Sequence, residues 1–238
     1  MANPFYTIED DIFKQFPGYC RGVVLAFDVK NSMSPPGLTE SLREAEAELR
    51  KHVNMDEIAT HPRLASWREA YRSFGAKPTN FRSSIEAMVR RVVNNNELPS
   101  INTIVDIGNI ISLRHLVTVG GHAIDVVTQD IELKKATGEE EFVPFGSDKM
   151  EHPLPGEIIF TEGNTVLTRR WSWRQANHTL TLESTTAVEM NVDGLPPVTM
   201  TEVEGICQEV IAMIERFCGG KLRYEILSED NTKIELAV

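Results

Sequence analysis

Two tryptophans and three arginines fall within the six residues 169–174. Indole rings offer stacking surfaces and guanidinium groups donate to anions, a combination suited to a nucleobase or another aromatic ligand. If the segment is a strand, alternation places Trp171 and Trp173 on one face. Arg170 and Arg174 then share the opposite face. A strand that buries two tryptophans in a core would have the same composition, so a structural role stays open.

A histidine and an asparagine form a second candidate group. His122 follows Gly120 and Gly121, and glycines let the backbone approach a ligand closely. A neutral imidazole can donate to or accept from a water or hydroxyl, and Asn109 supplies a carboxamide in the preceding segment. The separation from His115 matches no metal spacing, and no HExxH, GxSxG, GxxxxGK[ST] or GxGxxG pattern occurs. We therefore expect no metal and no cofactor.

Residues 62–91 are basic in a chain that is otherwise acidic. The 238 residues carry a net charge of −11, whereas this stretch contains seven basic and two acidic residues. The overall charge argues against non-specific binding of DNA or anionic membranes, but a local basic stretch can hold phosphates. The alternative is that these side chains only cover exposed helix faces. The candidate phosphate-binding residues are Arg63, Arg68, Arg72, Lys77 and Arg82.

The elements that must position these residues are helical first and extended later. Apolar residues recur at helical intervals in residues 41–53, 62–74, 83–93, 103–116 and 203–217, with capping-box spacing at Ser41 and Ser83. Strand patterns occupy residues 23–29, 123–127, 131–134, 157–160, 166–173, 178–183 and 222–227. This order predicts an α+β fold, with helices packed on an antiparallel or mixed sheet.

The chain is expected to divide into three parts and to work in the cytoplasm. We expect an N-terminal extension over residues 1–57, containing a strand and a helix, a core over 58–218, and a C-terminal strand or tail over 219–238. Three scattered cysteines predict neither a disulfide framework nor a zinc cluster. The N-terminus lacks the basic and apolar regions of a signal peptide. The longest apolar stretch, near residues 22–27, is far shorter than the ~20 residues that span a bilayer.

Several blocks of the sequence resemble a known family. INTIVDIGNIISL at residues 101–113, followed by HAID at 122–125, resembles a signature of the editing domain of the bacterial phenylalanyl-tRNA synthetase beta chain, formed by its third and fourth modules. Residues 61–86 and RRWSWRQ at 169–175 resemble stand-alone relatives of that domain. The likeness covers about residues 58–191. The family's AGVMGG loop is missing, and residues 171–174 stand in its region.

The resemblance implies a fold like that of the editing domain and a hydrolytic activity. In the synthetase, this domain hydrolyses the ester of tyrosine wrongly attached to phenylalanine tRNA, and water can attack without an enzymic nucleophile. Asn109 and His122 match polar positions that line the editing pocket, and Glu183 matches a glutamate near its far strand. These three are the expected catalytic residues. Without a synthetase core, the chain is not expected to charge tRNA by itself.

The leading hypothesis is therefore a deacylase that acts on a mischarged aminoacyl-tRNA in trans. Arg170, Trp171, Trp173 and Arg174 would hold the terminal adenosine or the aminoacyl group, and the basic residues of 62–91 would meet tRNA phosphates. A hydroxyl-bearing amino acid is the favoured cargo, because buried polar partners discriminate strongly for a hydroxyl. Two alternatives stay open: a non-catalytic module that binds a free amino acid or a small aromatic metabolite, and a subunit of a larger assembly.

Overall fold

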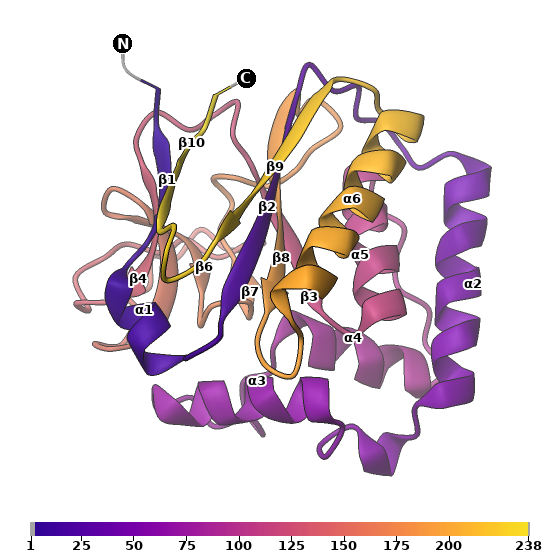
Figure 1. Ribbon diagram of the computed structural model, residues 1–238, viewed down its shortest axis with the longest axis horizontal. Coiled ribbons are helices and arrows are strands. Elements are labelled where there is room, and N and C mark those ends of the chain that lie inside the picture. Colours follow the sequence, from indigo (N-terminus) through magenta and orange to yellow (C-terminus); the bar gives the residue numbers. More distant parts are fainter. Residues whose placement is uncertain (1–2, 238) are drawn as a thin grey trace.

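Two β-sheets lie face to face, and helices cover the outer face of one of them (Figure 1). The structure is a computed structural model that describes residues 3–237. Its helices are α1 (Asp10–Gln15), α2 (Pro36–His52), the 3-10 helix η1 (Met55–Glu57), α3 (Pro62–Ser73), α4 (Ser84–Val93), α5 (Thr103–His115) and α6 (Met200–Phe217). Its strands are β1 (Phe5–Ile8), β2 (Cys20–Phe27), β3 (Thr118–Ala123), β4 (Ile131–Lys135), β5 (Ile158–Glu162), β6 (Thr165–Arg169), β7 (Arg174–Gln175), β8 (Ala187–Gly194), β9 (Lys221–Leu227) and β10 (Lys233–Glu235).

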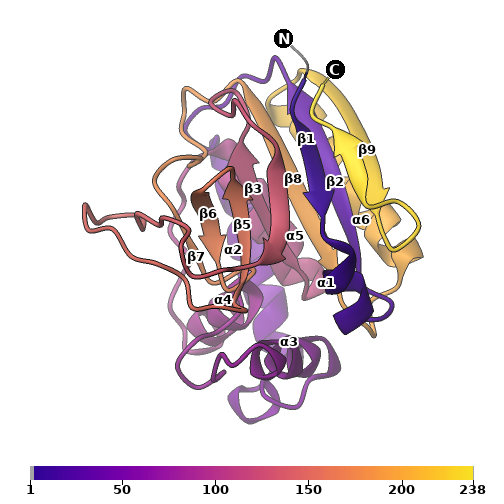
Figure 2. The same cartoon turned by 90° about the vertical axis from the view of Figure 1, so that its left-hand side faces the viewer.

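The strands form a six-stranded sheet in the order β10-β1-β4-β5-β6-β7 and a four-stranded sheet in the order β3-β8-β2-β9. We call these sheet A and sheet B. Only β1 and β4 run parallel, and all other neighbouring strands in the described residues are antiparallel. Helices α5 and α6 pack on one face of sheet B. Figure 2 views the molecule from the side of sheet A, with sheet B and α5 behind it. The α+β class predicted from the sequence is confirmed.

Strand β8 has an apolar face and a polar face, and both are buried. Because side chains alternate along a strand, its apolar residues face α5 and α6 while its polar residues face sheet A. The apolar set is Val188, Met190 and Val192, and the polar set is Glu189, Asn191 and Asp193. The space between the two sheets therefore contains carboxylates and amides that need hydrogen-bond partners.

Most predicted helices are confirmed, but one begins earlier than its sequence pattern indicates. Ser83 accepts a hydrogen bond from the backbone N–H of Glu86 and caps α4, as predicted. The predicted capping box at Ser41 is wrong, because α2 begins at Pro36, where proline suits the first helical turn. Ser41 instead lies inside α2 and donates to the carbonyl of Gly37.

The strand predictions are less accurate than the helix predictions. Strands β4, β5 and β9 confirm the patterns at residues 131–134, 157–160 and 222–227, and β2 extends the pattern at 23–29 toward the N-terminus. Of the expected strand 123–127, only Ala123 is in a strand, as the last residue of β3, and residues 178–183 form no strand. Gly120 and Gly121 do not make the turn they indicate but lie within β3. The predicted strand 166–173 ends at Arg169, because Arg170 and Trp171 adopt positive φ values of 46° and 64°.

The two ends of the chain contribute strands to the same sheets as its middle. β1 pairs with β10 in sheet A, and β2 lies between β8 and β9 in sheet B. The division into residues 1–57, 58–218 and 219–238 stays a prediction. Within residues 3–237, no helix has the length and apolar character needed to cross a membrane.

The three cysteine thiols should be unreactive while the protein is folded. Burial raises the pKa of Cys20 to about 11, of Cys207 to about 12 and of Cys218 to about 11. Since only the thiolate is nucleophilic, the native protein should resist alkylation by iodoacetamide at pH 8, as followed by intact mass spectrometry. The same protein in guanidinium chloride should take up three labels. Rapid labelling of any cysteine in the native protein would contradict the burial described here.

Candidate functional site

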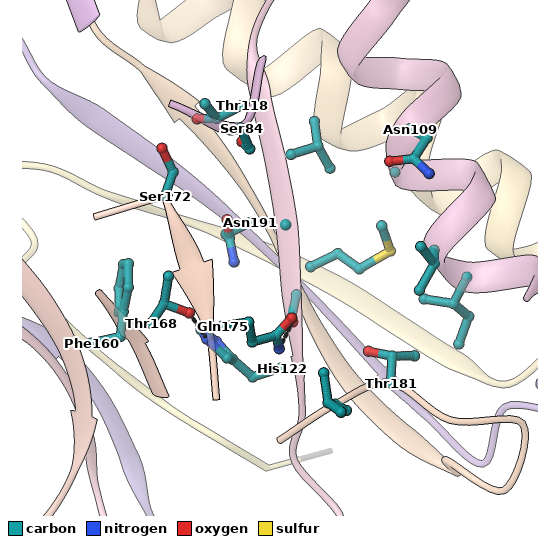
Figure 3. A pocket seen from close by; sticks show the side chains of 18 of the residues that line it. Ser84, Asn109, Thr118, His122, Phe160, Thr168, Ser172, Gln175, Thr181 and Asn191 are labelled. Atoms are coloured by element: carbon teal, nitrogen blue, oxygen red, sulfur yellow. Dashed lines mark hydrogen bonds between the residues drawn. The ribbon is translucent and has the colours of Figure 1, made fainter. Parts of the chain in front are cut away.

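A cavity of about 470 Å³ surrounds strand β3. Figure 3 shows this strand crossing the cavity, with polar side chains on one side of it and α5 on the other. Because β3 is the outermost strand of sheet B, side chains on both of its faces reach the cavity. The volume lies within the range of roughly 300–1,000 Å³ typical of small-molecule sites.

Two consecutive glycines keep the middle of the cavity open. A Cβ atom at Gly120 would lie 3.3 Å from Oδ1 of Asn191, and one at Gly121 would lie 2.7 Å from the backbone oxygen of Glu189. Position 121 therefore has no room for a side chain. The pair lets β3 approach β8 closely and leaves the polar and apolar sides of the cavity connected.

His122 bridges the two sheets at the polar side of the cavity. Its Nδ1 lies 2.5 Å from Oε1 of Glu189 on β8, and its Nε2 lies 2.9 Å from Oγ1 of Thr168 on β6. A carboxylate only accepts, so Nδ1 carries the proton and Nε2 accepts from the Thr168 hydroxyl. This is the arrangement of a hydroxyl, a base and an orienting acid that activates nucleophiles in hydrolases.

Glu189 is fully buried, and its partners hold it in place. It lies directly opposite His122 in the β3–β8 pairing. Asn191 Nδ2 donates to both carboxylate oxygens, at 3.1 and 3.3 Å. A buried carboxylate is stable only when hydrogen-bonded in this way. The imidazole is therefore fixed in orientation by the strand register and by one carboxylate.

The far end of the polar side is closed by a buried ion pair. Arg21 Nη1 lies 2.7 Å from Oδ1 of Asp193, and both side chains are almost fully buried. Thr118 Oγ1 and Tyr19 OH donate to the same carboxylate, at 2.8 and 2.6 Å. Burial, followed by the neighbouring Asp193 carboxylate, raises the pKa of Tyr19, which keeps the phenol protonated as a donor. Asp193 is thus satisfied without a ligand.

The free edge of β3 presents backbone groups to the cavity. Ala123 N–H bonds to the carbonyl of Thr179, and the Gly121 carbonyl accepts from Gln175 Nε2 at 3.1 Å, so alternate residues of β3 point their backbone groups away from β8. The N–H of Gly121 points to the same side as its carbonyl. In residues 3–237 it has no assigned partner. It is a hydrogen-bond donor directly before the histidine.

The opposite side of the cavity is apolar and comes from α5. Ile104, Val105 and Gly108 lie on the helix face that meets β3, and Met190 of β8 completes the wall. Asn109 also lines the cavity from this helix, as Figure 3 shows, and its side chain has no assigned partner within the described residues. The carboxamide and the imidazole thus share one cavity but stand on different sides of β3.

The two tryptophans have different environments. Trp171 is 1% exposed and makes edge-to-face contacts with Phe16, Tyr19 and Trp67, with ring centroids 4.8–5.2 Å apart. Its indole is part of the core as well as of the cavity floor. Trp173 is only half-buried and also lines the cavity. Because the chain turns at residue 170, the predicted alternation of faces is wrong.

The three arginines of residues 169–174 interact mainly with other side chains of the protein. Arg169 forms a two-point ion pair with Glu157, at 2.8 and 2.9 Å. Arg170 lies outside the cavity lining, 6% exposed, and stacks on the Trp173 ring at 4.5 Å. Arg174 lines the cavity and is 3.4 Å from Glu151. Of the three, only Arg174 can reach a ligand there.

Two of the five predicted phosphate-binding residues lie in ion pairs away from the cavity. Arg63 Nη2 is 2.6 Å from Oε1 of Glu202 on α6, and its other nitrogen donates to the carbonyl of His115. Arg72 pairs with Glu69, one turn earlier on α3. Their charges are partly neutralised within the protein.

The other three basic residues belong to α3 and to the loop before α4, and none of them lines the cavity. Arg68 is 2.7 Å from the buried carboxylate of Glu86 and is 13% exposed, so its charge is largely neutralised by this ion pair. Lys77 and Arg82 are exposed, in the loop before α4. Phe81 of this loop packs edge-on against Trp173, with ring centroids 5.0 Å apart, which brings the loop beside the cavity.

Sequence reasoning identified some cavity residues and missed others. Glu183 is exposed and does not line the cavity, although its neighbour Leu182 does. Thr168, Glu189 and Asn191 were missed. The alternation of polar and apolar residues over 187–194 was the signal that could have indicated a strand with a buried polar face. Among the residues that the structure describes, no cluster of histidine, cysteine or acidic side chains is placed to hold a metal ion.

The α+β fold and the cavity can now be compared with known proteins. The family model described as the B3/4 domain matches residues 66–219, more than half of the chain. A similar solved structure is an N-terminal fragment of the phenylalanyl-tRNA synthetase beta-subunit from Pyrococcus horikoshii, with 11% identity and a TM-score of 0.47. That match covers 94% of this chain and 52% of the fragment, so the chain spans about half the fragment's length. No curated protein matches.

The chain therefore belongs to the B3/4 domain family. This confirms the resemblance to the third and fourth modules of the phenylalanyl-tRNA synthetase beta chain that the sequence blocks indicated.

Replacing Arg169 should destabilise the fold. In Arg169→Met the carboxylate of Glu157, 3% exposed, loses its two-point partner. Breaking a buried ion pair costs about 3 kcal/mol or more. The matched variant Arg72→Met removes an exposed partner of Glu69 and should change stability by less than about 1 kcal/mol. Urea unfolding followed by circular dichroism measures both. Equal midpoints for the two variants would contradict a structural role for Arg169.

Proposed function

We propose that this protein hydrolyses the ester of a mischarged aminoacyl-tRNA in trans. The observation that carries the proposal is the position of His122, held between Glu189 and Thr168 at the wall of a cavity that also contains Asn109 and Trp173. Membership of the B3/4 domain family supports a role connected with tRNA.

Hydrolysis of an ester needs a base, a donor for the developing oxyanion and a means of orienting the substrate. His122 Nε2 is the base, because Glu189 keeps the proton of the ring on Nδ1. The free N–H of Gly121 lies beside it in the chain and serves as the oxyanion donor. Asn109 orients the aminoacyl group from the opposite side of β3. The site thus performs the reaction without a metal.

The two sides of the cavity bind different parts of the substrate. The apolar wall of α5 receives the amino-acid side chain, and the polar side receives the ester. At the mouth, Trp173 and Arg174 stack on and contact the terminal adenosine. Trp171 contributes the cavity floor, and its buried indole N–H has no partner in the described residues.

The tRNA approaches past the loop before α4. Lys77 and Arg82 are exposed there and close to Trp173 through Phe81, so they meet phosphates of the acceptor end. The ion-paired Arg63, Arg68 and Arg72 contribute less, because each is in close contact with a carboxylate. Arg82 is 3.9 Å from Glu86, and its side chain stays 43% exposed. Glu183 and Arg170 are not part of this proposal, since neither lines the cavity.

The direct test is deacylation of a panel of mischarged tRNAs. The protein should release one or a few amino acids, followed by loss of labelled aminoacyl-tRNA. In His122→Ala the rate should fall by roughly 100-fold or more, the usual contribution of a general base. His52→Ala, which removes an exposed histidine of α2, is the matched control and should leave the rate unchanged.

The same panel separates the proposal from a binding role. If no cargo is released faster than by His122→Ala, the hydrolytic function is refuted. Saturable thermal stabilisation by a free amino acid, combined with that result, would show the non-catalytic module instead.

Gly108 should limit the size of the accepted side chain. A Cβ there would lie 3.1 Å from Cε of Met190, so Gly108→Ala fills part of the apolar side. We expect the KM for the preferred cargo to rise, while helix propensity adds up to about 1 kcal/mol of stability. Gly205→Ala, whose Cβ would meet open space, should gain stability without any change in KM. Deacylation kinetics and thermal unfolding measure both. An unchanged KM in Gly108→Ala would contradict this assignment of the apolar wall.

A further inference from the structure

The imidazole of His122, the proposed general base, contacts the hydroxyl of Thr168. Its Oγ1 lies 2.9 Å from Nε2 of His122, and no other partner is assigned to it within residues 3–237. Thr168 is near the end of β6, where it pairs with Phe160 on one side and Gln175 on the other. The side chain is half-buried and lines the cavity. The hydroxyl of Thr168 is therefore accessible to a ligand and in contact with His122, the proposed general base.

We infer that Thr168 itself attacks the ester and carries the acyl group as a covalent intermediate. The lone pair of His122 Nε2 is directed at this hydroxyl, so a water could use the same base only after displacing it. The three groups Thr168, His122 and Glu189 have the roles of nucleophile, base and orienting acid. This inference rests on the proposed hydrolytic function and names its nucleophile.

Neighbouring groups complete the geometry that an acyl transfer needs. Gln175, opposite Thr168 in the β6–β7 pair, donates to the carbonyl of Gly121. This bond holds the free edge of β3 beside the threonine. The N–H of Gly121 points to that same edge, where the oxyanion of a tetrahedral intermediate would form. The hydroxyl thus comes from β6 of sheet A, and the oxyanion donor comes from the edge strand β3 of sheet B.

The reaction proceeds in two balanced halves. In the first, Thr168 Oγ1 forms a bond to the acyl carbon and gives its proton to His122 Nε2. The bond between the acyl carbon and the leaving ribose oxygen breaks, and that oxygen takes the proton. In the second, water gives a proton to Nε2 as its oxygen bonds to the acyl carbon. The Thr168 oxygen then leaves and recovers the proton from Nε2.

A covalent intermediate widens the class of substrates. The acyl carbon and its apolar chain contact α5 and β3, whereas the leaving group only has to accept a proton. Simple activated esters of apolar acids should therefore acylate Thr168 without any tRNA. We choose p-nitrophenyl butyrate as the probe, because its acyl chain matches the apolar wall of the cavity.

The test combines rapid kinetics with mass spectrometry on the whole protein. Mixing with p-nitrophenyl butyrate should give a burst of nitrophenolate close to one equivalent. Acid quenching should trap one butyryl group, and peptide mapping should place it on Thr168. Thr168→Val should abolish the burst and lower turnover by roughly 100-fold or more. Thr168→Ser, which keeps the hydroxyl, should restore acylation.

Controls separate the nucleophile from the fold and from the proposed function. Thr165→Val removes an exposed threonine of the same strand and should leave both burst and turnover unchanged. Thermal unfolding of Thr168→Val should match that of the native protein within a few degrees. Lack of any acylation by the ester, or turnover without an adduct, would overturn the covalent step. Deacylation of tRNA that persists in Thr168→Val would do the same but leave the proposed function intact, with water as nucleophile.

Discussion

The contact between Glu189 and His122 is the constraint on which the polar interior depends. A fully buried carboxylate is costly unless donors surround it, and here the imidazole and Asn191 supply them. Since the other ring nitrogen meets Thr168 of the facing sheet, the same contact links the two sheets. The pairing register of β3 and β8 places these side chains directly opposite each other. The contact between Glu189 and His122 therefore both stabilises the structure and orients the imidazole toward the cavity.

Several arginines of this acidic chain are paired with carboxylates. Arg63, Arg68 and Arg72 each face a carboxylate, and Arg169 is bound twice by Glu157. Lys77 and Arg82 are exposed in the loop before α4, whose Phe81 packs against Trp173, and Arg82 is 3.9 Å from Glu86. Because the chain carries a net charge of −11, a polyanion would be repelled by most of the protein.

The sequence predicts the fold class and half of the candidate site. Helices follow a 3.6-residue apolar period and capping residues, so α3 to α6 could be located. His122, singled out by the glycines before it, lines the cavity. Strand β8 was missed although its residues alternate, and alternation alone does not show whether the polar face meets solvent or a second sheet. Residues 169–174 do not continue the strand that their pattern predicts, because Arg170 has a positive φ and Trp171 packs in the core, which no local period reveals.

The central claim is that Glu189 fixes His122 as a base directed at the cavity. Long-range proton–nitrogen correlation spectra of the protein labelled with nitrogen-15 at histidine measure this directly. The account predicts that His122 carries its proton on Nδ1, facing Glu189, and that Nε2 is bare and accepts from Thr168. A proton found on Nε2 with a bare Nδ1 would contradict it, because the ring would then donate to the hydroxyl and could not remove its proton.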